Sequence, residues 1–112
     1  MVLVPDEVEE LKQIYGEIAR ADEGGLVYLL IKGLHLPAGC APPSSDALLR
    51  PMQRDGYDSR LYFASQIQSP TPRNWNGQVR ILDRNWFAFS WKLNASGLRL
   101  AQMVQMHLQG LR

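Results

Sequence analysis

The sequence of 112 residues contains one cysteine, Cys40, so no disulfide can form within the chain. It also lacks a C-x-x-C motif and any cluster of Cys and His residues at the spacing that zinc sites need. Both absences argue against a fold that is stabilised by disulfide bonds or by a structural metal ion. A reducing cytoplasm is therefore the expected location.

Neither sign of charge dominates the chain, which has 12 Lys and Arg residues, 11 Asp and Glu residues and a formal net charge of +1. The charged residues are scattered, so the sequence carries no basic patch that would indicate binding to nucleic acid or to an anionic membrane surface. We expect neither partner.

Long hydrophobic runs are also missing, since no apolar stretch approaches the ~20 residues of a membrane-spanning helix. The first residues contain no basic run and too short an apolar run for a signal peptide, so we expect neither export nor membrane insertion. Hydrophobic residues make up 46% of the chain and charged residues 21%, which is typical of a globular protein. The length predicts a single domain over residues 1–112.

The first periodic segment predicts an amphipathic helix. Asp6 follows Pro5 and precedes Glu9 by three positions, as in an N-cap with a capping-box partner. Apolar residues then recur at helical spacing, at Val8, Leu11, Ile14, Tyr15 and Ile18. We expect this helix to end near Ala21, because residues 22–25 supply flexible turn residues.

The middle of the chain alternates between strand-like and irregular segments. Residues 26–31 are apolar on both faces, which predicts a central strand that continues weakly to residue 36. The other expected strands are 46–52, 61–67 and 78–82, and the expected loops are the proline-rich 37–45, the polar 53–59 and the irregular 69–77. We interpret 46–52 and 61–67 as antiparallel neighbours.

The last segment predicts a second helix. Residues 94–97 offer capping side chains, and an apolar stripe follows at Leu100, Met103, Val104, Leu108 and Leu111. The order of elements is thus a helix, an antiparallel meander of three or four strands, an irregular aromatic segment and a closing helix. This order predicts an α+β fold with helices packed on a sheet.

The aromatic segment, residues 84–92, has four large aromatic residues among its nine. In an extended chain, alternate side chains share a face, so Phe87, Phe89 and Trp91 fall on one face and Trp86, Ala88 and Ser90 on the other. We expect the three rings of the first face to enter a core. Ser90 is then turned away from that core.

Three groups of residues resemble the ubiquitin-conjugating (E2) fold, and in particular a bacterial E2-like family encoded beside E1-like and ubiquitin-like proteins. Residues 34–39 are similar to a short Leu-Pro-x-Gly turn of that family. Residues 48–63 are similar to its apolar strand, Pro, Gly-Tyr and following strand, and residues 84–91 to its Trp-x-x-(aromatic)-Ser segment. Two positions depart from the pattern: Asp58-Ser59 replaces a frequent proline, and Trp91 replaces a common histidine.

The resemblance implies an E2/UBC-like domain and a transferase activity. Conventional E2 enzymes carry the ubiquitin-like protein as a thioester on cysteine, but Cys40 lies far from the corresponding segment. The related bacterial proteins are understood to use a serine and an oxyester, which makes Ser90 the expected acyl carrier. The implied partners are an E1-like adenylating enzyme and a ubiquitin-like protein, and no cofactor is required. Because proteins of this family usually occur with antiphage defence systems, the resemblance also implies a role in antiphage defence.

A serine nucleophile needs a base to take its proton and donors to stabilise the oxyanion. The resemblance implies that Asn74 or Asn76 supplies the donor, because conventional E2 enzymes use an asparagine upstream of the nucleophile; Asn85 is a third choice. The sequence leaves the base open among His35, Asp58, Asp83 and His107.

Simpler interpretations remain for each of these residues. Ser90 can be an ordinary strand-end residue, and Asn74 and Asn76 can be turn residues. The three tryptophans can be core residues or contacts for a partner. The alternative function is a catalytically inactive E2-variant-like module that binds a ubiquitin-like or E1-like partner non-covalently, and a third possibility is an unrelated small α+β interaction protein.

Overall fold

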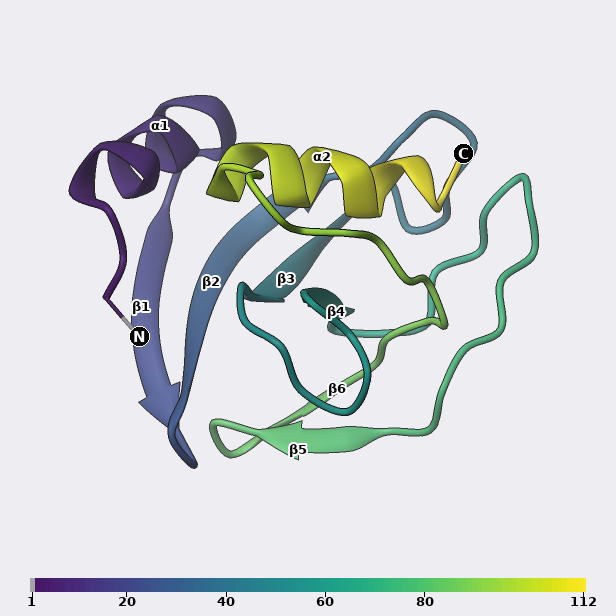
Figure 1. Cartoon of the computed structure of the whole chain (residues 1–112). Coiled ribbons are helices and arrows are strands. Elements are labelled where there is room, and N and C mark those ends of the chain that lie inside the picture. Colours follow the sequence, from purple (N-terminus) through teal and green to yellow (C-terminus); the bar gives the residue numbers. More distant parts are fainter. Residues whose placement is uncertain (1) are drawn as a thin grey trace.

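A computed structural model describes residues 2–112 and shows a three-layered α+β arrangement (Figure 1). Two helices, α1 and α2, cover one face of a four-stranded antiparallel sheet. A two-stranded hairpin, β5–β6, lies on the opposite face. The α+β class expected from the sequence is confirmed.

Helix α1 comprises Pro5–Tyr15 and begins without the expected capping box. Val4 occupies the N-cap position, no side chain caps the helix, and Pro5 stands in the first turn, where its missing N–H costs nothing. Asp6 and Glu7 still favour this end because acidic groups interact well with the positive end of a helix dipole. The prediction of Asp6 as N-cap with Glu9 as partner is therefore wrong.

The expected extent of the first helix is also wrong, because residues 18–23 form a strand. Gly16 has a φ of 91° and its N–H donates to the carbonyl of Lys12 at 2.8 Å, which ends α1. Strand β1, Ile18–Glu23, then pairs antiparallel with β2 from Ile18 opposite Ile31 to Glu23 opposite Leu26. The two glycines between them have positive φ values of 59° and 78°, as a tight hairpin turn requires.

The remaining strands of the sheet are close to those expected. Strands β2 (Leu26–His35), β3 (Ser44–Arg50) and β4 (Arg60–Phe63) follow β1 in the order β1-β2-β3-β4, all antiparallel. Three of the predicted strands therefore belong to an antiparallel meander, whose fourth strand, β1, was not predicted. The proline-rich loop ends at residue 43, and β4 is shorter than the predicted 61–67.

Strands β5 (Val79–Ile81) and β6 (Arg84–Trp86) form the separate hairpin. Its turn consists of Leu82 and Asp83, both with positive φ. The indole Nε1 of Trp86 donates to the carbonyl of Ile81 at 3.1 Å and closes the hairpin from inside. The strand expected at 78–82 is therefore present, and the start of the aromatic segment is its partner.

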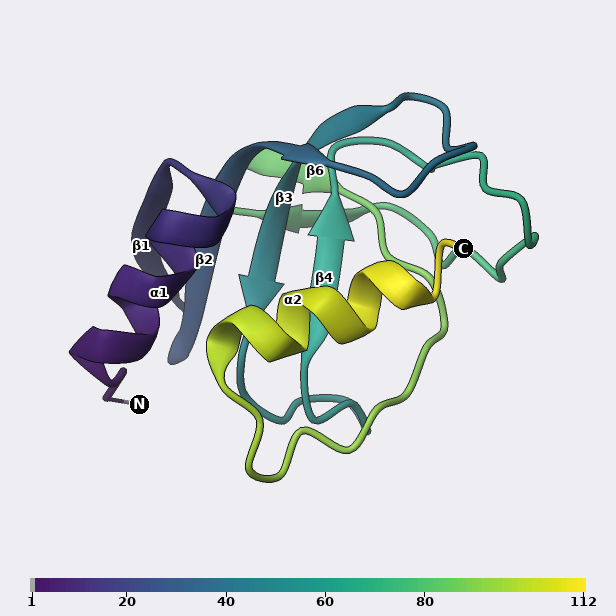
Figure 2. The same ribbon diagram turned by 90° about the horizontal axis from the view of Figure 1, so that it is seen from above.

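Helix α2, Leu100–Gln109, lies across β3 and β4 when viewed from above (Figure 2). Its N-cap is Arg99, whose N–H donates to the side chain of Gln102 at 2.8 Å. Glu7 of α1 accepts the N–H of Leu100 at 3.1 Å, so one helix caps the other. The expectation that residues 94–97 cap this helix is wrong; Asn94 instead bonds the N–H of Ser96 in the preceding turn.

The sheet separates two hydrophobic cores because its strands are buried on both faces. The first core joins the helices to one face of the sheet and contains Leu11, Leu29, Ile31, Leu49, Phe63, Phe89 and Val104. The second core joins the other face to the hairpin and contains Tyr28, Leu48, Tyr62, Ile81, Trp86 and Ala88.

Within residues 2–112, neither helix is both long and apolar enough to cross a lipid bilayer.

The aromatic segment contributes to both cores. Phe89 is 4% exposed in the first core and Trp91 packs partly buried against it. Trp86 and Ala88, which were expected to share the outer face with Ser90, are buried in the second core. Phe87 is half-buried and pairs through its backbone with Phe63 of β4. The alternation was right for Phe89 and Trp91, but Phe87 belongs to neither core. The assumption of one core was also wrong, because the sheet has a covered second face.

Candidate functional site

The segment containing Ser90 lies beside the irregular segment containing Asn74 and Asn76. The N–H of Ser90 donates to the carbonyl of Asn74 at 2.9 Å, and the N–H of Asn76 donates to the carbonyl of Ala88 at 2.8 Å. Trp75 and Phe89 form an antiparallel bridge between them. These backbone bonds fix the two segments side by side, so the three sequence-predicted site residues lie close together.

Asn76 contacts Ser90 directly through its side chain. The amide Nδ2 of Asn76 donates to Oγ of Ser90 at 3.3 Å, and Ser90 is half-buried. Arg60 Nη2 donates to Oδ1 of the same amide. Because a guanidinium can only donate, this bond orients the amide with its nitrogen toward Ser90. The site therefore presents a fixed hydrogen-bond donor to the serine oxygen.

Two cations beside the Tyr57 ring, Arg60 and Lys92, have no carboxylate partner among the described residues. The guanidinium of Arg60 lies 4.2 Å from the ring centre of Tyr57, and Lys92 Nζ lies 5.8 Å from the same ring centre. No ion pair of residues 2–112 involves Arg60 or Lys92. Of the two, Arg60 is tied to the Ser90 contact through its bond to Asn76.

The other two candidate donors are placed differently. Asn74 takes part through its backbone carbonyl, and its side chain is exposed. Asn85 lies on β6, where its Oδ1 accepts from Arg80 at 3.2 Å. Of the three asparagines, only Asn76 donates to Ser90 within residues 2–112.

His107 is a core residue of α2 and is paired elsewhere. Its Nε2 lies 3.0 Å from Oγ of Ser59, and both residues are at least 98% buried. Burial disfavours the imidazolium, and the nearby charges of Arg50 and Arg60 disfavour it further, so the pKa of His107 is lowered to about 4. His107 therefore stabilises the packing of α2 on the Ser59 loop.

The remaining candidate bases also have other surroundings. Asp58 accepts the N–H of Ala95 at 3.2 Å, and Asp83 pairs with Arg80 at 3.1 Å in the hairpin turn. His35 is exposed at the end of β2. None of the four candidates forms a hydrogen bond to Ser90 in the part of the chain that the structure describes, so the structure brings together the nucleophile candidate and a donor but no base.

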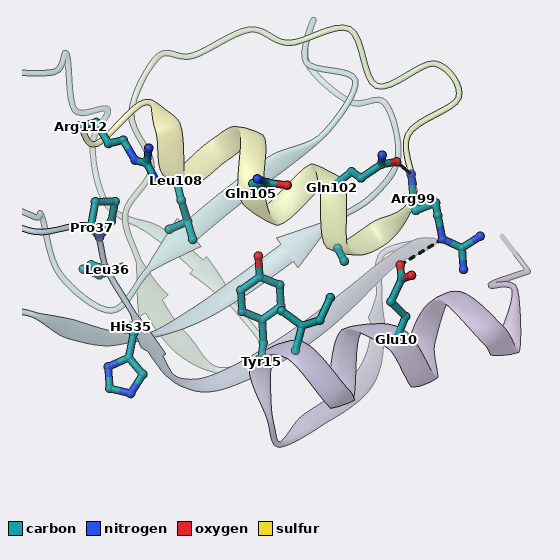
Figure 3. A pocket seen from close by; sticks show the side chains of 12 residues that line it. Glu10, Tyr15, His35, Leu36, Pro37, Arg99, Gln102, Gln105, Leu108 and Arg112 are labelled. Atoms are coloured by element: carbon teal, nitrogen blue, oxygen red, sulfur yellow. Dashed lines mark hydrogen bonds and ion pairs between the residues drawn. The ribbon is translucent and has the colours of Figure 1, made fainter.

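A separate groove of about 520 Å³ lies between α1 and α2, and His35 lines it (Figure 3). The ion pair of Glu10 and Arg99, 3.0 Å long, closes one end, and Arg112 lies at the other. Tyr15 projects into the middle, and partial burial raises the pKa of its hydroxyl. Apart from the candidate base His35, the groove contains none of the predicted site residues.

Arg60, Tyr57 and Lys92 were missed by sequence reasoning. Lys92 follows Ser90 by two positions, so the alternation of an extended chain already places both on one face. No comparable signal marks Arg60, whose approach to Asn76 depends on the path of residues 64–75.

Cys40 is buried, and its thiol lies 3.6 Å from the carbonyl of Leu111. Burial raises the pKa of this thiol, so it stays protonated and is a poor nucleophile at neutral pH.

No group of three or more His, Cys, Asp or Glu side chains in residues 2–112 is placed to hold a metal ion.

Comparison with known proteins does not add to this description. No protein-family model matches the chain, and neither a curated protein nor a solved structure gives a significant match.

Proposed function

We propose that this chain is an E2-like carrier of a bacterial ubiquitination-like pathway. In this proposal an E1-like enzyme adenylates a ubiquitin-like protein with ATP, and Ser90 accepts the C-terminal acyl group as an oxyester before passing it to a target. The observation that carries the proposal is the bond from Asn76 Nδ2 to Ser90 Oγ, with the amide oriented by Arg60. In this proposal the Asn76 amide, which bonds the free serine hydroxyl, moves to the acyl carbonyl oxygen when that oxygen becomes an oxyanion.

The order of elements supports the same proposal in a coarser way. A first helix, a four-stranded antiparallel meander and a closing helix are the elements that the resemblance to E2 proteins implies. Ser90 lies between the meander and the closing helix, which is where an E2-like carrier holds its acyl group.

The acyl transfer forms a bond between Ser90 Oγ and the acyl carbon and breaks the bond from that carbon to its leaving group on the E1-like enzyme. The hydroxyl proton must go to a base. Because no base of residues 2–112 is bonded to Ser90, the proposal assigns this proton to a group of the E1-like partner or to water.

The same lack of a base favours a second candidate, an E2-variant-like module that binds a ubiquitin-like or E1-like partner without forming a covalent bond. In that case the exposed cation Lys92 and the half-buried Trp91 belong to a contact surface rather than to a catalytic site.

Intact mass after incubation with the E1-like enzyme, the ubiquitin-like protein and ATP separates the two candidates. The carrier predicts an adduct that hydroxide cleaves and thiols do not, mapped to Ser90. Ser90→Ala should abolish the adduct, and Ser90→Cys should make it thiol-labile, while Ser96→Ala, a change of an exposed loop serine, should leave it unchanged. Stable binding without an adduct would instead support the module, and an adduct that survives Ser90→Ala would refute the carrier.

A further inference from the structure

A small cavity of about 240 Å³ lies between the sheet and the β5–β6 hairpin. Its walls come from the end of β1, from β2, β3, β4 and β5, and from the loop that contains Arg54 and Asp55. The polar side chains that line it belong to Tyr28, Tyr62, Arg50, Arg54, Arg80, Glu23 and Asp55. It is distinct from the Ser90 site, because Ser90, Asn76 and Arg60 do not line it.

Arg50 is the central residue of this cavity and is only 1% exposed. Its Nε donates to the carbonyl of Met52 at 3.0 Å, and its Nη2 donates to the carbonyls of Arg54 and Tyr57 at 3.0 and 3.1 Å. Its Nη1 donates to the hydroxyl of Tyr62 at 3.0 Å. None of these acceptors is a carboxylate, so a buried positive charge has no counter-ion within residues 2–112. Such a charge is costly unless an anion compensates it.

Three hydrogen-bond donors at the cavity wall are left over. Nη1 of Arg50 carries a second N–H beyond the one bonded to Tyr62. The Tyr62 hydroxyl accepts from Arg50, so its own hydrogen can be donated elsewhere. Tyr28 is 5% exposed, and its hydroxyl is neither in a hydrogen bond among the described residues nor one of the fully buried polar atoms that lack a partner. Burial and Tyr62 raise the pKa of Tyr28, so its hydroxyl remains protonated and able to donate.

The rim of the cavity carries two arginines, Arg54 and Arg80, and two carboxylates, Glu23 and Asp55. Arg80 pairs with Asp83, whose side chain is 98% exposed, and Arg54 lies 3.8 Å from the exposed carboxylate of Asp55. Ion pairs between exposed groups contribute little to stability, so a ligand can compete with them for both guanidinium groups. Glu23 is already engaged, because its carboxylate accepts the N–H of Leu82 at 3.1 Å.

We propose that this cavity is a binding site for a small tetrahedral oxyanion, such as inorganic phosphate or the phosphoryl group of a small ligand. Tyr28, Arg50 and Tyr62 come from three successive strands and line one cavity, to which Arg50 brings N–H donors and each tyrosine brings a hydroxyl that can donate. A tetrahedral oxyanion offers acceptors in three dimensions, whereas the acceptor positions of a carboxylate lie in one plane. Arg50 supplies the buried charge that such an anion would compensate.

Calorimetric titration with inorganic phosphate at constant ionic strength tests this site. Wild type should show saturable binding with one site, and phosphate should raise the thermal midpoint more than chloride does. Tyr28→Phe removes one hydroxyl that has no partner in the protein, so the fold should persist while phosphate affinity falls about tenfold. Arg80→Gln should weaken binding in the same direction by removing a rim charge.

Tyr15→Phe is the matched control, because it removes a part-buried hydroxyl in the groove between the helices. It should leave phosphate affinity unchanged. Absence of saturable binding, equal affinity in wild type and Tyr28→Phe, or equally strong binding of acetate would each overturn the proposal. None of these outcomes bears on Ser90, so the site and the proposed carrier function can fail separately.

Discussion

Asn76 Nδ2 lies 3.3 Å from Ser90 Oγ, and Arg60 holds the other end of the same amide. The two residues are 14 positions apart and come from segments without regular secondary structure. Backbone bonds between Asn74 and Ser90 and between Asn76 and Ala88 keep them in register. The contact is open to direct test by substitution of either residue.

If Ser90 is an acyl carrier, Asn76→Ala should slow adduct formation about 10²-fold, the usual cost of losing one oxyanion donor. Asn74→Ala is the control, because Asn74 contributes only its backbone carbonyl and the substitution keeps that carbonyl. Single-turnover rates measured by intact mass provide the comparison. Equal rates for the two variants would remove Asn76 from the catalytic site.

His107 should make stability fall in mild acid. Its folded pKa of about 4 lies below the usual 6.5, so below pH 6.5 the unfolded state binds more protons than the folded state. Stability is therefore full above pH 6.5 and is lost as pH falls toward 4, by on the order of 3 kcal/mol. Urea unfolding at a series of pH values measures the slope, which His107→Gln should reduce and the exposed-site variant His35→Gln should keep. A slope unchanged by His107→Gln would contradict the assignment.

Gly110 lies against the aromatic segment at the end of α2. A Cβ there would approach Phe89 to 2.8 Å and Trp91 to 3.0 Å, closer than real carbon contacts allow. Gly110→Ala should therefore lower the free energy of unfolding by about 1–3 kcal/mol through overpacking.

Gly77→Ala is the matched control for this prediction. Nothing lies within 4 Å of a Cβ at Gly77, so denaturant unfolding should show little change or a small gain. A Gly110→Ala variant as stable as wild type would mean that the rings of Phe89 and Trp91 move aside easily.

Glu7 should stabilise the second helix as well as the first. Its carboxylate accepts the N–H of Leu100, an otherwise unpaired donor at the start of α2. Glu7→Ala should cost about 1 kcal/mol of stability in denaturant unfolding, as the loss of other N-terminal caps does. Glu9→Ala changes an exposed acid in the same turn and should cost much less; equal losses would refute the capping role.

Local patterns predicted much of the sheet and the closing helix. The sequence identified β2, β3, β4 and the apolar stripe of α2. Burial makes apolar residues recur at regular intervals in such elements, or makes them continuous where both faces are covered. The nearness of Ser90 to Asn76 was expected from the resemblance to E2 proteins, and the side-chain contact is present. The carrier function itself remains a proposal.

Residues 16–23 show where a local pattern misled. Ile18 continues the helical spacing of α1, but Gly16 ends the helix and the free edge of β2 takes residues 18–23 as a strand. Gly16 was a readable stop signal, whereas the pairing with β2 involves residues that no short window contains.

The sequence by itself determined the α+β class, the central strands, the closing helix and the alternation of the aromatic segment, because each depends on neighbours within a few residues. The tertiary structure alone decided that both faces of the sheet are covered, so that Trp86 and Ala88 are buried in a second core. It alone brought Arg60 to Asn76, His107 to Ser59, and Tyr28 and Tyr62 to one cavity with Arg50. These contacts join residues up to 48 positions apart, and their partners are chosen by how the layers pack rather than by the local sequence.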